Sequence, residues 1–135
     1  MSRTHEHLIQ LRWSDPDSYG HVNHARALSL LEDARLAMGV AAPGIEPGRQ
    51  PDIILARLEV DYLRQLHYRV GEQVRVRSWV TRVGTKSLTM RQELVQDGEV
   101  AIRLDAVIVL FDITTDASRP MTEEERAYWS SFLAA

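Results

Sequence analysis

The sequence predicts an α+β fold in which one long helix packs against an antiparallel sheet. One helical pattern follows a first strand pattern, and four further strand patterns then follow one another without an intervening helix. Strands joined without a crossover helix mostly pair antiparallel, and a single helix then covers one face of their sheet. The chain has 135 residues, the length of one domain with one core, so residues 1–135 are expected to form a single domain.

The first two elements are defined by the spacing of their apolar residues. Residues 8–13 alternate like a strand that places Trp13 on its apolar face. A helix is expected from about 24 to 38, ended by Gly39. Because Leu28 and Leu36 lie off its main stripe, other structure is expected to wrap this helix. The stripe itself comprises Ala27, Leu30, Leu31, Ala34 and Met38.

The second half of the chain is rich in strand patterns. It is preceded by a Gly/Pro-rich loop at 39–52, longer than most connections and therefore a candidate for a functional role. Gly84-Thr85 predicts a turn, and Asp97-Gly98 predicts a two-residue hairpin. The expected strands cover residues 53–65, 73–83, 87–96 and 99–113.

A short helix is expected at the end of the chain. Pro120 and the capping box from Thr122 to Glu125 mark its start. A sheet with one helix on one face keeps open edges, so oligomerisation is expected. The apolar residues that this last helix is expected to bury are Trp129, Phe132 and Leu133.

Composition excludes several classes of function. The chain has no cysteine, which excludes disulfides, thiolate zinc sites and thiol nucleophiles. The net charge of −3 argues against nucleic acid as a partner. No apolar run approaches the roughly 20 residues of a membrane span, and none resembles a signal peptide, so no membrane partner and a cytoplasmic location are expected.

Residues 13–24, WSDPDSYGHVNH, hold the main chemical signal. They place a carboxylate (Asp17), Gly20, an imidazole (His21) and an amide (Asn23) where a strand passes into a helix. Backbone N–H groups at a helix start are unpaired and partly positive, so they can polarise a carbonyl. A carboxylate beside them can attack that carbonyl or activate water, which suggests hydrolysis of an acyl group.

Each of these residues also has a structural reading. Asp17 could form an Asx-turn, and Asn23 could be the N-cap of the helix. Asp15 is expected to be structural, whereas His21 either orders the loop or tunes the site. A calcium loop is excluded because Tyr19 and Arg26 occupy ligand positions. No metal is expected, because His21, His24 and Asp17 lack further ligands nearby.

The sequence around this segment is similar to that of a known family. The string RWSDPDSYGHVNHARALSLLEDAR, residues 12–35, resembles the signature of hotdog-fold thioesterases of the 4-hydroxybenzoyl-CoA thioesterase type. That signature contains Asp-x-Asp-x-x-Gly-His-Val-Asn-Asn, then a helix with Glu-x-Ala-Arg. The resemblance continues through 53–66, similar to the family's second strand, and 83–87, similar to its central turn.

The resemblance implies a hotdog fold, with the long helix wrapped by a five-stranded antiparallel sheet. It implies a homodimer with sites at the interface, a dimer of dimers being the alternative. It implies hydrolysis of an acyl-CoA thioester without a cofactor. Asp17 matches the catalytic carboxylate, as nucleophile or general base, and the backbone N–H of His24 matches the group that polarises the thioester carbonyl. His21 and Asn23 match a His and an Asn found in many relatives.

Substrate-binding residues are also expected. Lys86 is a candidate for binding a phosphate of CoA. The candidates for an apolar acyl tunnel are Ala25, Leu28, Leu58, Val60 and Tyr62. The candidate substrate contacts are Gly20, Tyr62, Gly84, Thr85, Lys86 and Ser87.

Two departures from the family pattern concern the pocket. Relatives commonly have Asn at the position of His24 and Tyr at the position of Ala27. Both changes alter the shape of the pocket and leave the backbone donor in place. Glu32 is a second candidate carboxylate, although its simplest role is an intrahelical pair with Arg35.

Three alternatives remain beside acyl-CoA hydrolysis. They are a non-catalytic acyl-CoA-binding hotdog module, a hotdog acyl-carrier-protein thioesterase and a hotdog hydratase. The hydratase pattern Asp-x-x-x-x-His is one residue longer than the spacing from Asp17 to His21. Serine chemistry is disfavoured because no Gly-x-Ser-x-Gly motif occurs.

Overall fold

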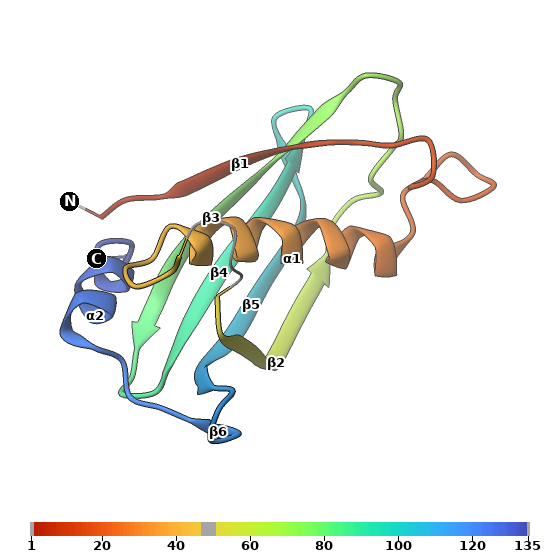
Figure 1. The fold of residues 1–135 in the computed structure, drawn as a ribbon. Helices are drawn as coiled ribbons and strands as arrows, with labels where there is room; N and C mark the ends of the chain where they lie inside the picture. Colours follow the sequence, from red (N-terminus) through yellow and green to blue (C-terminus); the bar gives the residue numbers. More distant parts are fainter. Residues whose placement is uncertain (1, 47–50, 135) are drawn as a thin grey trace.

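The computed structural model describes residues 2–46 and 51–134. One helix lies across the concave face of a strongly curved sheet, and a second, short helix lies at one end of that sheet (Figure 1). In chain order the elements are β1 (His5–Gln10), α1 (His24–Val40), β2 (Ile53–Tyr62), β3 (Gln73–Val83), β4 (Ser87–Gln96), β5 (Glu99–Asp112), β6 (Ala117–Ser118) and α2 (Glu123–Ser130).

The sheet is antiparallel throughout and has the strand order β1-β3-β4-β5-β2, with β6 paired to β5. The predicted α+β fold with a central helix wrapped by a sheet is therefore confirmed as a hotdog-type fold. The sheet has six strands rather than five, because the two-residue β6 is too short to leave an alternating pattern. Among the described residues, no helix is both long and apolar enough to cross a membrane.

The hairpin between β4 and β5 follows directly from its two turn residues. Asp97 and Gly98 both have positive φ, 56° and 73°, which is the conformation of a type I′ turn. This turn fixes the register of β4 against β5, so the apolar residues of both strands face α1 together.

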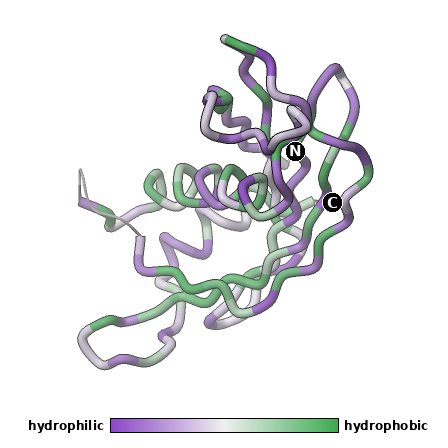
Figure 2. Tube along the Cα trace, turned by 90° about the vertical axis from the view of Figure 1, so that its right-hand side faces the viewer, coloured by the Kyte–Doolittle hydropathy of each residue, from purple (hydrophilic) through white to green (hydrophobic). Residues whose placement is uncertain are grey.

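The core lies between α1 and the concave face of the sheet. The predicted helical stripe is buried, and Leu31, Ala34 and Met38 are completely inaccessible to solvent. Figure 2 shows hydrophobic residues along both the helix and the strands beneath it. Burial of each Leu or Met side chain contributes about 1.5–3 kcal/mol, so this stripe holds the helix on the sheet.

The first strand begins and ends three residues earlier than expected. β1 covers His5–Gln10, and the chain then turns, with Asp15 N donating to Arg12 O at 2.9 Å. Leu11 is buried as expected, but Trp13 is 83% exposed. The prediction for Trp13 was wrong because the turn ends the alternation that the sequence shows.

Gly39 does not end α1, which continues to Val40. Gly39 is buried, and a Cβ at this position would lie 2.9 Å from Cγ of Pro51. The glycine is therefore needed for the close approach of the returning chain. Part of the predicted loop at 39–52 lies outside the described residues.

Arg35 has a different main partner from the one expected. Its guanidinium donates to Oε1 of Gln92 at 2.9 Å, whereas Glu32 lies 4.0 Å away. Gln92 in turn donates to Ser78 and to the backbone carbonyl of Leu31. Burial lowers the pKa of Arg35 from its ordinary value. This polar cluster joins α1 to β3 and β4 inside the core.

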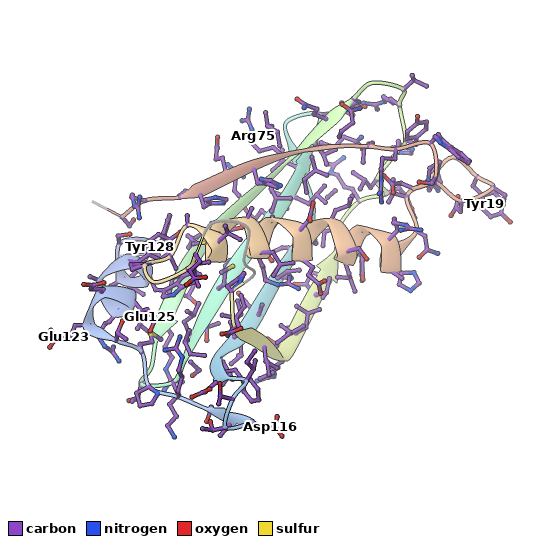
Figure 3. The ribbon with its side chains drawn as sticks, viewed as in Figure 1. Tyr19, Arg75, Asp116, Glu123, Glu125 and Tyr128 are labelled. Atoms are coloured by element: carbon purple, nitrogen blue, oxygen red, sulfur yellow. The ribbon has the colours of Figure 1, made fainter. Side chains whose placement is uncertain are left out.

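The second helix starts at the predicted capping box. Thr122 Oγ1 accepts from Glu125 N at 3.1 Å, and Glu125 accepts from Thr122 N at 2.9 Å. Tyr128, labelled in Figure 3, donates its hydroxyl to Met38 O at 2.6 Å and thereby links α2 to α1. Trp129 and Phe132 are buried as expected, but Leu133 is 37% exposed.

Acid is expected to weaken this end of the molecule. Hydrogen bonds from Arg119, and then from the Thr122 backbone, lower the pKa of the buried Glu125 below its ordinary value of 4.5. A carboxyl whose pKa is lower in the folded state stabilises the protein above its unfolded pKa and loses that effect as pH falls. Thermal unfolding from pH 7 to pH 3 should therefore show Glu125→Gln less stable than wild type at pH 7, with the difference shrinking below about pH 4.5. A constant difference across this range would contradict the expectation.

Candidate active site

The loop between β1 and α1 closes on itself around Asp17. Asp17 N donates to His21 O at 2.7 Å, and Gly20 N donates to Asp17 O at 3.1 Å. Gly20 has a φ of +76°, which favours glycine at this position. Tyr19 lies at the tip of the loop and points away from the sheet (Figure 3). The turn brings the base of the loop, where Asp17 lies, back to the start of α1.

The Asp17 carboxylate is held by one of its two oxygens. Oδ1 accepts from Tyr19 N at 2.9 Å and from His21 N at 3.2 Å. Oδ2 accepts no hydrogen bond from the described part of the chain. Asp17 therefore forms the predicted Asx-turn through Oδ1. It also fixes the orientation of the carboxylate and leaves Oδ2 available to a ligand.

Asp15 occupies a different environment from Asp17. It is 2% exposed and accepts from Arg12 N at 2.7 Å. The guanidinium groups of Arg12 and Arg26 lie 3.1 and 3.8 Å from its Oδ1. Its contacts are those of a residue that ties the loop to α1, as the sequence predicted.

The start of α1 presents a free backbone donor. Asn23 is the N-cap, and its Oδ1 accepts from Ala25 N at 2.8 Å. His24 is the first helical residue, and its N–H has no acceptor among the described residues. A donor at this position is unpaired because the helix supplies no carbonyl before it. The His24 ring packs edge-on against Tyr62, with ring centroids 5.9 Å apart.

A pocket of about 540 Å³ opens between the start of α1 and the end of β2. It brings together Asp17, Asn23, His24 and Tyr62, four of the residues that the sequence singled out. The remaining lining residues are Val22, Ala27, Leu63, Arg64, Gln65, Leu66 and Ile102. Of the five residues proposed for an acyl tunnel, only Tyr62 lines this pocket. Leu58 and Val60 lie further back along β2.

Residues 63–66 were missed as part of the site. The sequence assigned them mostly to a strand, but β2 ends at Tyr62. The amides of Leu63 and Arg64 both donate to Ala101 O, at 2.8 and 3.1 Å, so the chain leaves the sheet and forms one wall of the pocket. The only signal in the sequence is the polar pair Arg64-Gln65, which interrupts the apolar alternation.

His21 and Gly20 do not line the pocket. The His21 ring lies edge-on against His67, with centroids 4.8 Å apart, and the two residues form a backbone bridge. His21 thus has the loop-ordering contact that was one of its two expected roles. The described residues contain no group of three or more His, Asp or Glu side chains placed to hold a metal ion. The expectation that no metal is used remains a prediction.

The turn at 84–87 lies far from Asp17 within one chain. It joins β3 to β4 at the end of the sheet opposite to the start of α1 and the end of β2 (Figure 1), which border the pocket. A strand as long as β3 spans roughly 35 Å. Gly84 N donates to Ser87 O at 2.7 Å, while the carbonyls of Thr85 and Lys86 accept from Met121 and Leu110. The expected substrate role of these four residues therefore needs a second chain, and it stays a prediction.

Loss of the helix cap is expected to affect both stability and the pocket. Asn23→Ala removes the side chain that holds Ala25 N, which should lower the free energy of unfolding by about 1 kcal/mol. Because His24 N lies beside the cap, turnover of substrate should also fall. Chemical denaturation and steady-state kinetics measure the two effects. Asn23→Ser, which can still cap, should restore most of both, and unchanged kinetics in Asn23→Ala would contradict the expectation.

Comparison with known proteins agrees with this fold. The model of the family described as "Thioesterase-like superfamily" matches residues 11–130. A predicted thioesterase from Bacillus stearothermophilus is 27% identical, with a TM-score of 0.86 and 98% of each chain covered. A thioesterase from Thermus thermophilus, crystallised with coenzyme A and Zn, is 30% identical, with a TM-score of 0.78, covering 94% of this chain and 92% of its own. The uncharacterized protein YsmA of Bacillus subtilis (strain 168) is 23% identical over 120 residues, 87% of this chain and 80% of YsmA. The family model spans most of the sequence and includes the whole pocket, so this chain belongs to the thioesterase-like superfamily.

Proposed function

We propose that this protein hydrolyses an acyl-CoA thioester to the free acid and CoA, in the manner of the 4-hydroxybenzoyl-CoA thioesterase type. The observation that carries the proposal is the pairing of a fixed carboxylate with a free helix-start amide in one pocket. Asp17 and His24 both line that pocket. The coenzyme A in the related Thermus thermophilus crystals supports a CoA ester as the substrate.

The thioester carbonyl would bind at the start of α1. The N–H of His24 would donate to the carbonyl oxygen and stabilise the negative charge that develops on it. The partial positive charge of the 17-residue helix acts in the same direction. Asn23 orients this donor by capping the helix.

Asp17 would supply the second part of the reaction. In one route its Oδ2 takes a proton from a water molecule, whose oxygen attacks the carbonyl carbon. The tetrahedral intermediate then expels the CoA thiolate, which takes up a proton. In the other route Oδ2 attacks first, the thiolate leaves, and water cleaves the resulting mixed anhydride. The hydrogen bonds to Oδ1 hold the carboxylate in place for either route.

The test is the release of thiol from a panel of acyl-CoA thioesters with aliphatic and aromatic acyl groups. At least one should be hydrolysed with a kcat/KM well above that of Asp17→Asn. Acyl-pantetheine and acyl-carrier protein, tested beside the CoA esters, distinguish the carrier that the protein accepts. Absence of thiol release from every ester would refute the proposal.

A non-catalytic acyl-CoA-binding module is the second candidate. The observation that favours it is the Asx-turn, because Asp17 shapes the loop whether or not it reacts. Binding of acyl-CoA without turnover, unchanged in Asp17→Asn, would support the module over the enzyme.

A homodimer through β2 would complete the site. β2 pairs only with β5 and has one free edge among the described strands, near which Ile54, Leu55, Tyr62 and Leu63 are 42–50% exposed. A two-fold axis perpendicular to the sheet would pair β2 antiparallel with its copy. It would also bring the partner's turn at 84–87 to the end of the joint sheet where Asp17 lies. Lys86 would then be available to a CoA phosphate bound across the interface.

The expected assembly is thus a dimer or a dimer of dimers at micromolar concentration. A lysine at Leu55 places a charge beside the free edge and should shift the equilibrium toward monomer, with loss of turnover. Sedimentation velocity measures the shift, and Leu8→Lys, at an exposed position on the opposite edge strand β1, is the control. A fully active wild-type monomer would exclude this arrangement.

A further inference from the structure

Backbone hydrogen bonds join the pocket wall to the Asp17 loop. The pocket wall is residues 63–68, of which four line the pocket. The Asp17 loop is residues 17–22. Val22 N donates to Leu66 O at 2.7 Å, and Tyr68 N donates to Gly20 O at 3.1 Å. These two bonds alternate along the wall as they would along a strand, so the wall positions the loop by backbone pairing.

His67 lies between these two bonds, and its own backbone groups point the other way. His67 N donates to Oε1 of Gln96 at 3.0 Å, and Nε2 of Gln96 donates to His67 O at 2.8 Å. Gln96 is the last residue of β4 and is 8% exposed. Its side-chain amide takes the place that a neighbouring strand would fill on this side of the wall.

We propose that Gln96 is a positioning residue for the reaction at Asp17. It touches neither the pocket nor Asp17, and it acts through His67 and the backbone of the Asp17 loop. The role requires one donor and one acceptor in the same side chain, because His67 offers both an N–H and a carbonyl. A primary amide meets this requirement, whereas a carboxylate or an apolar side chain does not. The effect on turnover rests on the proposed function, but the effect on loop order does not.

In the variant Gln96→Glu, the ability of the side chain to donate a hydrogen bond to His67 O depends on pH. When ionised, the introduced carboxylate would have no donor for His67 O and would also face Glu72, whose Oε1 lies 3.4 Å from Nε2 of Gln96. When protonated, the introduced side chain has the shape of glutamine and can again donate to His67 O. The other charged or titratable groups around this position are Asp97 and Arg69, which pair with each other at 2.7 and 2.9 Å, and the ring of His67. Glu99 lies opposite Gln96 on β5 and forms an ion pair with Arg64. Glu72 also pairs with Arg69, at 3.4 Å.

The main experiment compares Gln96→Glu, Gln96→Leu and wild type between about pH 5.5 and 8.5. At pH 8 both variants should lose at least about tenfold in kcat with a smaller change in KM, because a displaced catalytic group lowers the rate more than binding. Burial and the nearby Glu72 carboxylate favour the protonated form of the introduced side chain. As pH falls, Gln96→Glu should therefore recover toward the wild-type value measured at the same pH, whereas Gln96→Leu should not.

Gln92→Glu is the matched control. Gln92 is also buried on β4, but its contacts are Arg35, Ser78 and Leu31 O, far from the pocket wall. The control variant should lower thermal stability while leaving the pH profile of kcat parallel to that of wild type. A Gln96→Glu profile parallel to that of Gln92→Glu, or a folded Gln96→Leu within about twofold of wild type, would overturn the proposal.

Amide hydrogen exchange tests the same coupling without any substrate. In Gln96→Leu the amides of Val22, His67 and Tyr68 should exchange faster than in wild type, while those in the middle of β3 and β5 stay protected. Unchanged protection of these three amides would also overturn the proposal. If the wild-type protein hydrolyses no thioester, the proposed function fails, and the exchange result still decides whether Gln96 orders the loop.

Discussion

Replacement of Asp17 by asparagine is expected to lower kcat by at least about 100-fold while the fold stays intact. The asparagine Oδ1 can accept the same hydrogen bonds from Tyr19 N and His21 N that the aspartate accepts. The variant therefore keeps the loop and removes only the charge and the basicity of the second oxygen. Asp17→Ala would remove the hydrogen bonds that hold the loop as well as the carboxylate charge, so it could not separate loss of the loop from loss of the catalytic group.

Asp15→Asn is the matched control, because the same change is made two residues earlier in the same loop. Asp15 is buried against Arg12, so its loss should appear in the free energy of unfolding, by about 1–2 kcal/mol. Its effect on kcat should be much smaller than that of Asp17→Asn. Steady-state kinetics and denaturant titration of both variants give the comparison. Near-normal turnover in a folded Asp17→Asn protein would show that Asp17 only shapes the loop.

Features that depend on neighbouring residues were predicted well from the sequence. The turn at Asp97-Gly98 and the capping box at Thr122 need only local backbone conformations and short side-chain contacts. The juxtaposition of Asp17 with the start of α1 is local in the same sense, because His24 follows it by only seven positions. These parts of the fold and the site follow from the order of residue types.

Features that depend on distant partners were not predictable in this way. Gln96 and His67 are 29 positions apart, and nothing near either residue indicates that an amide will pair with a backbone segment. Gly39 is similar to a helix-ending glycine in sequence, but Pro51 determines its role in the fold. The turn at 84–87 is another example. The family resemblance identifies this turn in the sequence, but the turn does not line the pocket of its own chain.

The second large effect is expected from a proline at His24. Proline has no N–H, so His24→Pro removes the donor that would polarise the thioester carbonyl. Loss of one such donor lowers kcat by about 100- to 1,000-fold. The first position of a helix tolerates proline, because its N–H has no partner within the helix. Asn23 has φ −56° and ψ 143°, the extended conformation that a residue before proline prefers, so the helix start should persist.

Two controls separate the backbone group from the side chain and from proline itself. His24→Asn changes the ring and keeps the N–H, so its kcat should stay within roughly tenfold of wild type. Glu123→Pro places proline at the first position of α2, remote from the pocket, and should leave kcat unchanged. Circular dichroism and thermal unfolding check that all three variants fold, and thiol release measures their kcat. If His24→Asn loses activity as completely as His24→Pro, the imidazole is the working group. If a folded His24→Pro keeps a kcat near that of wild type, the backbone amide of His24 has no part in the reaction.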